Sequence, residues 1–168
     1  MSGVSIFDLD GNGMKEIIYA DQFNLHIFSG DNGDTLSQIQ VGNGTLAEIP
    51  VIADVDNDNQ AEIIVAANNY WNPSYTKGIL VFGASDSSWF NTRKIWNQYG
   101  YHITNISDDF SVPRSEENSW IASGTYRSNV LIPFTGCYDV SASYVRINAS
   151  NLPGSAEVTV RIGNGGLL

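Results

Sequence analysis

The stretch IFDLDGNGMKEIIYA, residues 6–20, places three acidic side chains and an asparagine within nine positions, between apolar runs on both sides. The stretch IADVDNDNQAEIIVA, residues 52–66, repeats this arrangement 46 residues later, with Asp54 in the place of Asp8. Like charges repel, so a chain that gathers them between two segments suited to a core needs something to hold them together. The repeated acidic loop is the feature that decides the fold.

Short runs rich in Val, Ile, Tyr, Phe and Thr dominate residues 1–91 and alternate with clusters of Gly, Asn, Asp and Ser. This pattern is typical of β-strands joined by turns. Residues 4–20 align with residues 50–66, and each unit consists of a strand, the acidic loop, a strand, a turn and a further strand. A 46-residue period of short strands indicates a β-propeller blade and not a helical solenoid. Because propellers usually take about four to eight blades, we expect two blades to be an open piece, completed by copies or by further sequence.

The character of the chain changes after the second unit. Residues 92–136 are aromatic and polar without a third acidic loop, and we expect an irregular, ordered segment that caps the last blade. In residues 137–168, the alternating stretches DVSASYVRI and AEVTVRIGN flank a Pro-Gly turn, as in the opening strands of a β-sandwich. A whole sandwich needs about 100 residues, so only its start is expected here.

Composition limits the classes of function. The 168 residues carry 18 Asp and Glu against 8 Lys and Arg, a formal charge of −10, which argues against nucleic acid as a partner and suits cation binding. Cys137 is the only cysteine, which excludes a disulfide framework and a CxxC metal site. We expect no membrane insertion, because no apolar run reaches about 18 residues. The N-terminus lacks the features of a signal peptide, and we interpret the chain as a fragment of a longer protein.

Oxygen ligands recur at fixed positions of the two loops. They are Asp8, Asp10, Asn12, the Met14 carbonyl and Glu16 in the first loop, and Asp54, Asp56, Asp58, the Gln60 carbonyl and Glu62 in the second. A set of oxygens without His or Cys selects a hard cation, and calcium accepts six to eight of them in flexible geometry. An EF-hand is excluded, because its twelfth position would be Tyr19 or Val65 and its flanks would be strands.

A simpler interpretation is that Asp, Asn and Gly only form hairpin turns with solubilising charges. The presence of Glu at the same place in both loops favours a metal instead. Two carboxylates ~4 Å apart repel by about 4 kcal/mol at an effective dielectric constant of 20, so a converging loop without a cation would be strained. The second loop has four carboxylates against three, which predicts tighter calcium binding there. Its Asn57 and Asn59 replace Gly11 and Gly13, and Asn tolerates left-handed backbone at a small cost.

At these residues the chain resembles the FG-GAP repeats, also called VCBS-type repeats, of integrin α-subunit propellers and bacterial surface proteins. The resemblance covers residues 4 to about 90 and includes VFGAS at residues 81–85, where the first repeat has IFSG. It implies a propeller blade with calcium bound in the loop, held by the ten ligands named above. The sequence departs from the family at the neutral Asn12, at the missing glycines 57 and 59, and by having Glu where many members have Asp. The C-terminal residues are similar to the start of a CARDB-type sandwich. The fold class is therefore expected to be all-β, with two propeller-type blades carrying acidic calcium loops, then a truncated sandwich.

Other motifs are less specific. GNGTLA, residues 42–47, fits a dinucleotide fingerprint formally, but a strand follows it instead of a helix. We expect His26 to face solvent or a neighbouring strand. For His102 we favour a hydrogen-bonded role in a loop over a role as a zinc ligand or a base. The pairs 108–109 and 116–117 could supply two glycosidase carboxylates, yet acidic loops are usually solvated. For Trp89 and Trp96 we expect core packing, whereas the inserted loop with Tyr70, Trp71 and Tyr75 is the better candidate for ligand contact.

Taken together, the sequence predicts a non-catalytic, calcium-binding propeller fragment with two Ca²⁺ sites. Its parent would be a secreted or cell-surface protein acting in adhesion or as a binding scaffold, with an extracellular protein or glycan as partner. The alternative is an accessory or catalytic part of a polysaccharide-degrading enzyme. A third possibility is a pure spacer.

Overall fold

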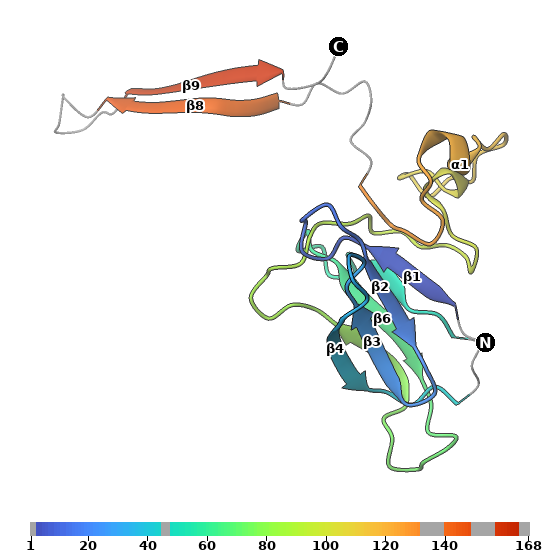
Figure 1. The fold of residues 1–168 in the computed structure, drawn as a ribbon. Coiled ribbons are helices and arrows are strands. Elements are labelled where there is room, and N and C mark those ends of the chain that lie inside the picture. The colour runs from blue at the N-terminus through green and yellow to red at the C-terminus, as the bar shows by residue number, and fades with distance from the viewer. Residues whose placement is uncertain (1–2, 45–47, 132–139, 149–156, 165–168) are drawn as a thin grey trace. The chain divides into compact units, whose positions relative to one another are not determined.

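The computed structural model describes residues 3–44, 48–131, 140–148 and 157–164 (Figure 1). By its internal contacts the chain divides into two units, Met1–Leu131 and Ile132–Leu168. Each unit is described by itself.

The first unit begins with a four-stranded antiparallel sheet in the order β1-β2-β3-β4. Its strands are β1 (Val4–Phe7), β2 (Glu16–Ala20), β3 (Asn24–Phe28) and β4 (Thr35–Gln40). Burial alternates along β1 and β2, and the buried residues share one face of the sheet. The first acidic loop joins β1 to β2 and begins just after the pair formed by Phe7 and Glu16.

A second antiparallel sheet repeats this arrangement with three strands, β5 (Val51–Ala53), β6 (Glu62–Ala67) and β7 (Gly78–Phe82). The second acidic loop joins β5 to β6 and begins after the pair formed by Ala53 and Glu62, which corresponds to Phe7 and Glu16 after a shift of 46 residues. The expected strand, acidic loop, strand unit is therefore present twice, and the all-β prediction is confirmed.

The two sheets share one hydrophobic core but use opposite faces to build it. The first sheet contributes Phe7, Ile18, Ala20, Leu25 and Ile27, and the second contributes Ile52, Ile63 and Val65. After a shift of 46 residues, Ile52, Ile63 and Val65 correspond to Ile6, Ile17 and Tyr19, which lie on the other face of the first sheet. We name the face of the first sheet that bears Ile18, and the equivalent face of the second sheet, the front face, and the opposite face of each sheet the back face. The front face of the first sheet packs against the back face of the second, so the repeats stack in one direction and do not form a symmetric pair.

Residues 92–131 are mostly irregular, with a single-turn 3₁₀ helix η1 (Ile103–Asn105) and a short helix α1 (Ser119–Ala122). This segment is fixed to the sheets by polar contacts. Asn129 is fully buried, and its Nδ2 donates hydrogen bonds to the carbonyl oxygens of Ile52 at 2.8 Å and Arg93 at 2.9 Å. The division into residues 1–91, a capping segment of residues 92–136 and residues 137–168 stays a prediction. Among the described residues, no helix has the length and apolar character needed to cross a membrane.

The second unit contains an antiparallel hairpin of β8 (Val140–Asn148) and β9 (Glu157–Asn164). These strands coincide with the two alternating stretches seen in the sequence. The expected Pro-Gly turn and Cys137 lie outside the described residues. The CARDB-like sandwich stays a prediction.

Candidate metal centres

A buried glutamate closes the base of each acidic loop. Oε2 of Glu16 accepts a hydrogen bond of 2.7 Å from the backbone N–H of Leu9. Oε2 of Glu62 accepts the equivalent bond of 2.9 Å from the N–H of Val55. Both glutamates are the first residues of their strands and are less than a tenth exposed. The two loops are thus folded by the same contact at the same place.

The curvature of the loops depends on left-handed backbone. Gly11 and Gly13 have φ angles of 70° and 90°, and Asn57 and Asn59 both have φ of 68°. Glycine adopts this region without steric cost, and Asn is the side chain that tolerates it best. The expectation that the two asparagines replace the glycines in left-handed backbone is confirmed.

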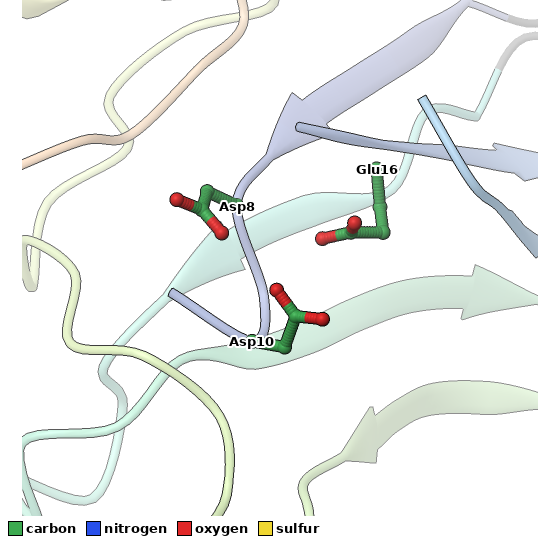
Figure 2. Close-up of side chains that lie close together, drawn as sticks. All are labelled: Asp8, Asp10 and Glu16. Atoms are coloured by element: carbon green, nitrogen blue, oxygen red, sulfur yellow. The ribbon is translucent and has the colours of Figure 1, made fainter. Parts of the chain in front are cut away.

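In the first loop the carboxylates of Asp8, Asp10 and Glu16 converge, with one oxygen of each within 4.8 Å of the others. Figure 2 shows the three side chains directed toward a common centre. Asp8 Oδ2 accepts the N–H of Gly13 at 2.9 Å, whereas its Oδ1 is buried with no hydrogen-bond partner. Asn12 donates its Nδ2 to Asp10 at 2.8 Å, and its Oδ1 accepts the N–H of Met14 at 2.7 Å.

In the second loop the converging group consists of Asp54, Asp56 and Asp58, again within 4.8 Å. Asp54 is 2% exposed; its Oδ1 accepts the N–H of Asn57 at 2.7 Å, and its Oδ2 has no hydrogen-bond partner. Asp58 accepts the backbone N–H and the side-chain amide of Gln60, both at 2.8 Å. Glu62 is outside this group of three and remains at the base of the loop.

Burial and neighbouring negative charges both raise the pKa values of Glu16 and Glu62. Burial raises the pKa of Glu16, the hydrogen bond from Leu9 opposes that shift, and the nearby charges of Asp10 and Asp8 raise the pKa further. Burial likewise raises the pKa of Glu62, against the hydrogen bond from Val55 and with the charges of Asp56, Asp58 and Asp54. The net direction is upward for both, because desolvation and like charges disfavour the ionised form.

The donors fit a hard cation. Each loop presents carboxylate oxygens without nitrogen or sulfur, and each contains a buried aspartate oxygen that lacks a hydrogen-bond donor. Buried carboxylate oxygens without partners are costly in the absence of a positive charge. Met14, whose side chain is half exposed, and Gln60 were expected to contribute backbone carbonyls, and those two ligands stay predictions.

Two residues that follow β7 also belong to the surroundings of the loops. Lys94 Nζ donates a hydrogen bond of 2.8 Å to Asn57 Oδ1 and lies 3.9 Å from Asp54 Oδ2. Phe90 joins the two loops, because its N–H donates to the Leu9 carbonyl at 2.7 Å and its carbonyl accepts the N–H of Ala61 at 3.0 Å. Sequence reasoning missed both residues. The only feature of the sequence that could have indicated the contact of Lys94 with the second loop is that a basic residue follows shortly after an acidic repeat.

The other sequence candidates are engaged elsewhere. His26 stacks between Tyr19 and Phe28, and its Nε2 lies 2.9 Å from Asp21 Oδ2. His102 pairs with Glu116. Asp108 accepts a hydrogen bond of 2.8 Å from the Nε of Arg93. Trp89 and Trp96 pack against the main core, as expected.

The inserted loop between β6 and β7 presents an exposed aromatic pair. Tyr70 and Trp71 are 72% and 56% exposed, with ring centroids 5.1 Å apart in an edge-to-face arrangement. Tyr75 is half-buried. The first two side chains are therefore accessible to a ligand, and ligand contact by this loop stays a prediction.

Comparison with known proteins supports the resemblance. Residues 8–65 match the FG-GAP-like repeat family, so the recognition of this repeat type is confirmed there. The crystal structure of the biofilm matrix protein Bap1 of V. cholerae is similar, with a TM-score of 0.70 and 31% sequence identity over 78% of this chain. The match spans 22% of the length of that protein. The comparison with curated proteins finds no match.

Proposed function

We propose that this chain is a calcium-binding β-propeller fragment of a secreted or cell-surface protein, and that it acts in adhesion or as a binding scaffold. The observation that carries the proposal is the repeated loop in which a buried aspartate oxygen, Asp8 Oδ1 or Asp54 Oδ2, has no hydrogen-bond donor among converging carboxylates. The FG-GAP-like repeat and the similarity to a biofilm matrix protein support an extracellular, adhesion-type role.

Calcium would stabilise the fold and would take no part in a chemical reaction. Bound among Asp8, Asp10 and Glu16, or among the carboxylates of the second loop, it would neutralise repelling charges and fix the hairpin that sets the register of two strands. Extracellular calcium modules bind at ~10⁻⁴ to 10⁻³ M, so the sites would fill outside a cell and not in the cytosol.

The direction of sheet stacking supports the propeller part of the proposal. Because the first sheet uses its front face and the second its back face, the same contact can be repeated by further sheets. The second sheet carries an apolar front face for such a contact, which includes the half-buried Ile64 and Ala66 and the exposed Ile79 and Val81.

We further propose that the chain has no catalytic role and that Tyr70 and Trp71 contact the ligand. The non-catalytic part rests on the acidic side chains that an enzyme would use: Asp108 is paired with Arg93 and Glu116 with His102. An exposed aromatic pair offers faces for sugar rings or for apolar side chains of a protein. A Tyr70→Ala/Trp71→Ala double variant should lose binding to a glycan and matrix-protein array while it keeps the melting temperature of the parent. Equal binding by the parent and the variant would contradict the assignment of this pair.

The calcium proposal is tested by calorimetric titration of calcium into EDTA-treated protein, with the melting temperature followed in parallel. We expect two saturable binding events and a raised melting temperature, because a ligand at 100 times its Kd adds about 2.7 kcal/mol per site. Asp10→Asn and Asp56→Asn each remove one exposed carboxylate and should weaken one event each. Asp31→Asn, in the turn between β3 and β4, is the matched control and should weaken neither. Absence of heat together with an unchanged melting temperature would contradict the proposal.

A further inference from the structure

Lys94 places a positive charge against the second acidic loop. Its ammonium donates a hydrogen bond of 2.8 Å to Asn57 Oδ1 and lies 3.9 Å from Asp54 Oδ2, the buried oxygen that no hydrogen-bond donor satisfies. The Asp54 side chain is fully buried, whereas that of Lys94 is half exposed. Among the ion pairs of the described residues, none involves a carboxylate of the first loop. The two loops are therefore alike in backbone and different in counter-charge.

The position of Lys94 is set by its neighbour Arg93, which is 7% exposed. The Arg93 guanidinium donates to Asp108 Oδ1 and to the Ile106 carbonyl, both at 2.8 Å. The Arg93 carbonyl accepts the N–H of Asp54 at 3.2 Å and the Nδ2 of Asn129 at 2.9 Å. The backbone next to Lys94 is thus held against the start of the second loop, and the lysine side chain needs to order only its own rotamers to reach Asn57.

Charge arithmetic shows what this contact changes. The carboxylates of Asp8, Asp10 and Glu16 carry a formal charge of −3, which the exposed Lys15 of the same loop reduces to −2. The second loop has four carboxylates, Asp54, Asp56, Asp58 and Glu62, and a formal charge of −4. The ammonium of Lys94 brings this to −3, so the extra carboxylate of the second loop is offset by the lysine.

We propose that Lys94 is a tethered counter-ion of the second loop, which stabilises that loop without calcium and lowers its calcium affinity. This inference rests on the proposed calcium function. A cation that enters beside Asp54 meets the repulsion of the ammonium or must displace it from Asn57. The advantage that charge count alone would give the second loop over the first is then reduced.

The test compares Lys94→Gln with Lys77→Gln, an exposed lysine in the loop before β7, so that both variants lose the same charge. Both are made in an Asp10→Asn background, in which the first loop is weakened and the tighter calorimetric event reports the second loop. We expect Lys94→Gln to tighten calcium binding by about tenfold to thirtyfold, since a unit charge about 4 Å from a divalent cation in water changes affinity by this order. Lys94→Gln should also lower the melting temperature in EDTA, because Asp54 then loses the one ion-pair partner that it has among the described residues. Lys77→Gln should change neither quantity.

Equal calcium affinities of the two variants would overturn the inference, as would an unchanged melting temperature of Lys94→Gln in EDTA. If the parent protein takes up no calcium, the proposed function fails, and the EDTA melting curves decide the counter-ion role alone. A lower melting temperature for Lys94→Gln but not for Lys77→Gln then supports that role, and equal values overturn it.

Discussion

The carboxylate of Glu16 lies 2.7 Å from the backbone nitrogen of Leu9 and accepts a hydrogen bond from its N–H group across the base of the first loop. The bond needs an acceptor oxygen but not a negative charge. The charge itself is unfavourable there, because burial and the neighbouring carboxylates raise the pKa of Glu16. The calcium-free fold therefore favours an uncharged Glu16 side chain, whereas a bound cation requires the same side chain to be ionised.

Glu16→Gln separates the effect of the hydrogen bond from the effect of the negative charge. The amide oxygen of Gln can still accept the Leu9 N–H, and the substitution removes a charge that repels Asp8 and Asp10, so we expect the melting temperature in EDTA to stay equal or rise. The increase produced by calcium should become smaller, because one anionic ligand of the first loop is lost. Melting curves with EDTA and with saturating calcium measure both effects. A drop of more than about 1 kcal/mol in the calcium-free unfolding free energy would contradict this account.

The raised pKa values of Glu16 and Glu62 also predict how calcium-dependent stability changes with pH. The folded, calcium-free protein binds these protons more tightly than the unfolded chain, so its free energy of unfolding falls as pH rises from the ordinary Glu value through the raised values. Calcium requires the ionised form, so the gap between melting temperatures with and without calcium should widen over the same range. The double variant Glu16→Gln/Glu62→Gln should flatten both trends. A gap independent of pH between about 4.5 and 7 would contradict the prediction.

Left-handed backbone at position 59 predicts a specific order of stabilities. Asn59 is exposed with φ of 68°, so Asn59→Gly should be nearly neutral and Asn59→Ala should cost about 1 kcal/mol. Gly13→Ala is the matched change in the first loop, because a Cβ there meets no atom within 4 Å and tests the backbone alone. Urea unfolding measures the three free energies. Equal stability of the Ala and Gly variants at position 59 would show that the backbone strain is absent.

The acidic loops and their strands could be predicted from sequence because their signals are local. The spacing of Asp8, Asp10 and Glu16 and the recurrence of that spacing at Asp54 depend only on neighbouring positions. The left-handed backbone of Asn57 was also predictable, since it follows from alignment with Gly11. A strand such as β2, by contrast, carries Ile17 and Ile18 on opposite faces, so its apolar pattern does not show which face the second sheet covers.

Contacts that depend on tertiary structure had no signal of this kind. Phe90 connects the two loops through backbone atoms, which any residue could supply. Lys94 reaches Asn57 because the buried Arg93 holds the intervening chain in place, and nothing in the spacing between positions 57 and 94 indicates it. The candidate ligands were therefore predictable from the sequence. Lys94, which adds a positive charge beside the second loop, and Phe90, which connects the two loops, were not.

Substitution of Asn129, which lies outside the loops, is expected to lower the free energy of unfolding strongly. The Asn129 side chain is fully buried, donates to the carbonyls of Ile52 and Arg93, and accepts the hydroxyl of Tyr101. Asn129→Ala leaves these groups short of partners, so we expect a loss of about 2 to 4 kcal/mol in the free energy of unfolding. Asn32→Ala, at an exposed turn, should cost less than about 0.5 kcal/mol and serves as the control in the same urea titration. Similar losses in both variants would contradict a bracing role for Asn129.

The front face of the second sheet predicts self-association of the isolated chain. This face carries the exposed Ile79 and Val81 and corresponds to the face that the first sheet uses in the core, so its natural complement is the back face of another first sheet, in a second copy. We expect reversible association at high protein concentration in sedimentation velocity. Val81→Lys should shift the protein to monomer without loss of calcium binding, because a charge at the centre of an apolar contact is desolvated without a partner. Val112→Lys, an exposed residue of the irregular segment, should leave association unchanged. If both lysine variants associate as the parent does, the sheets do not extend their stacking through this face.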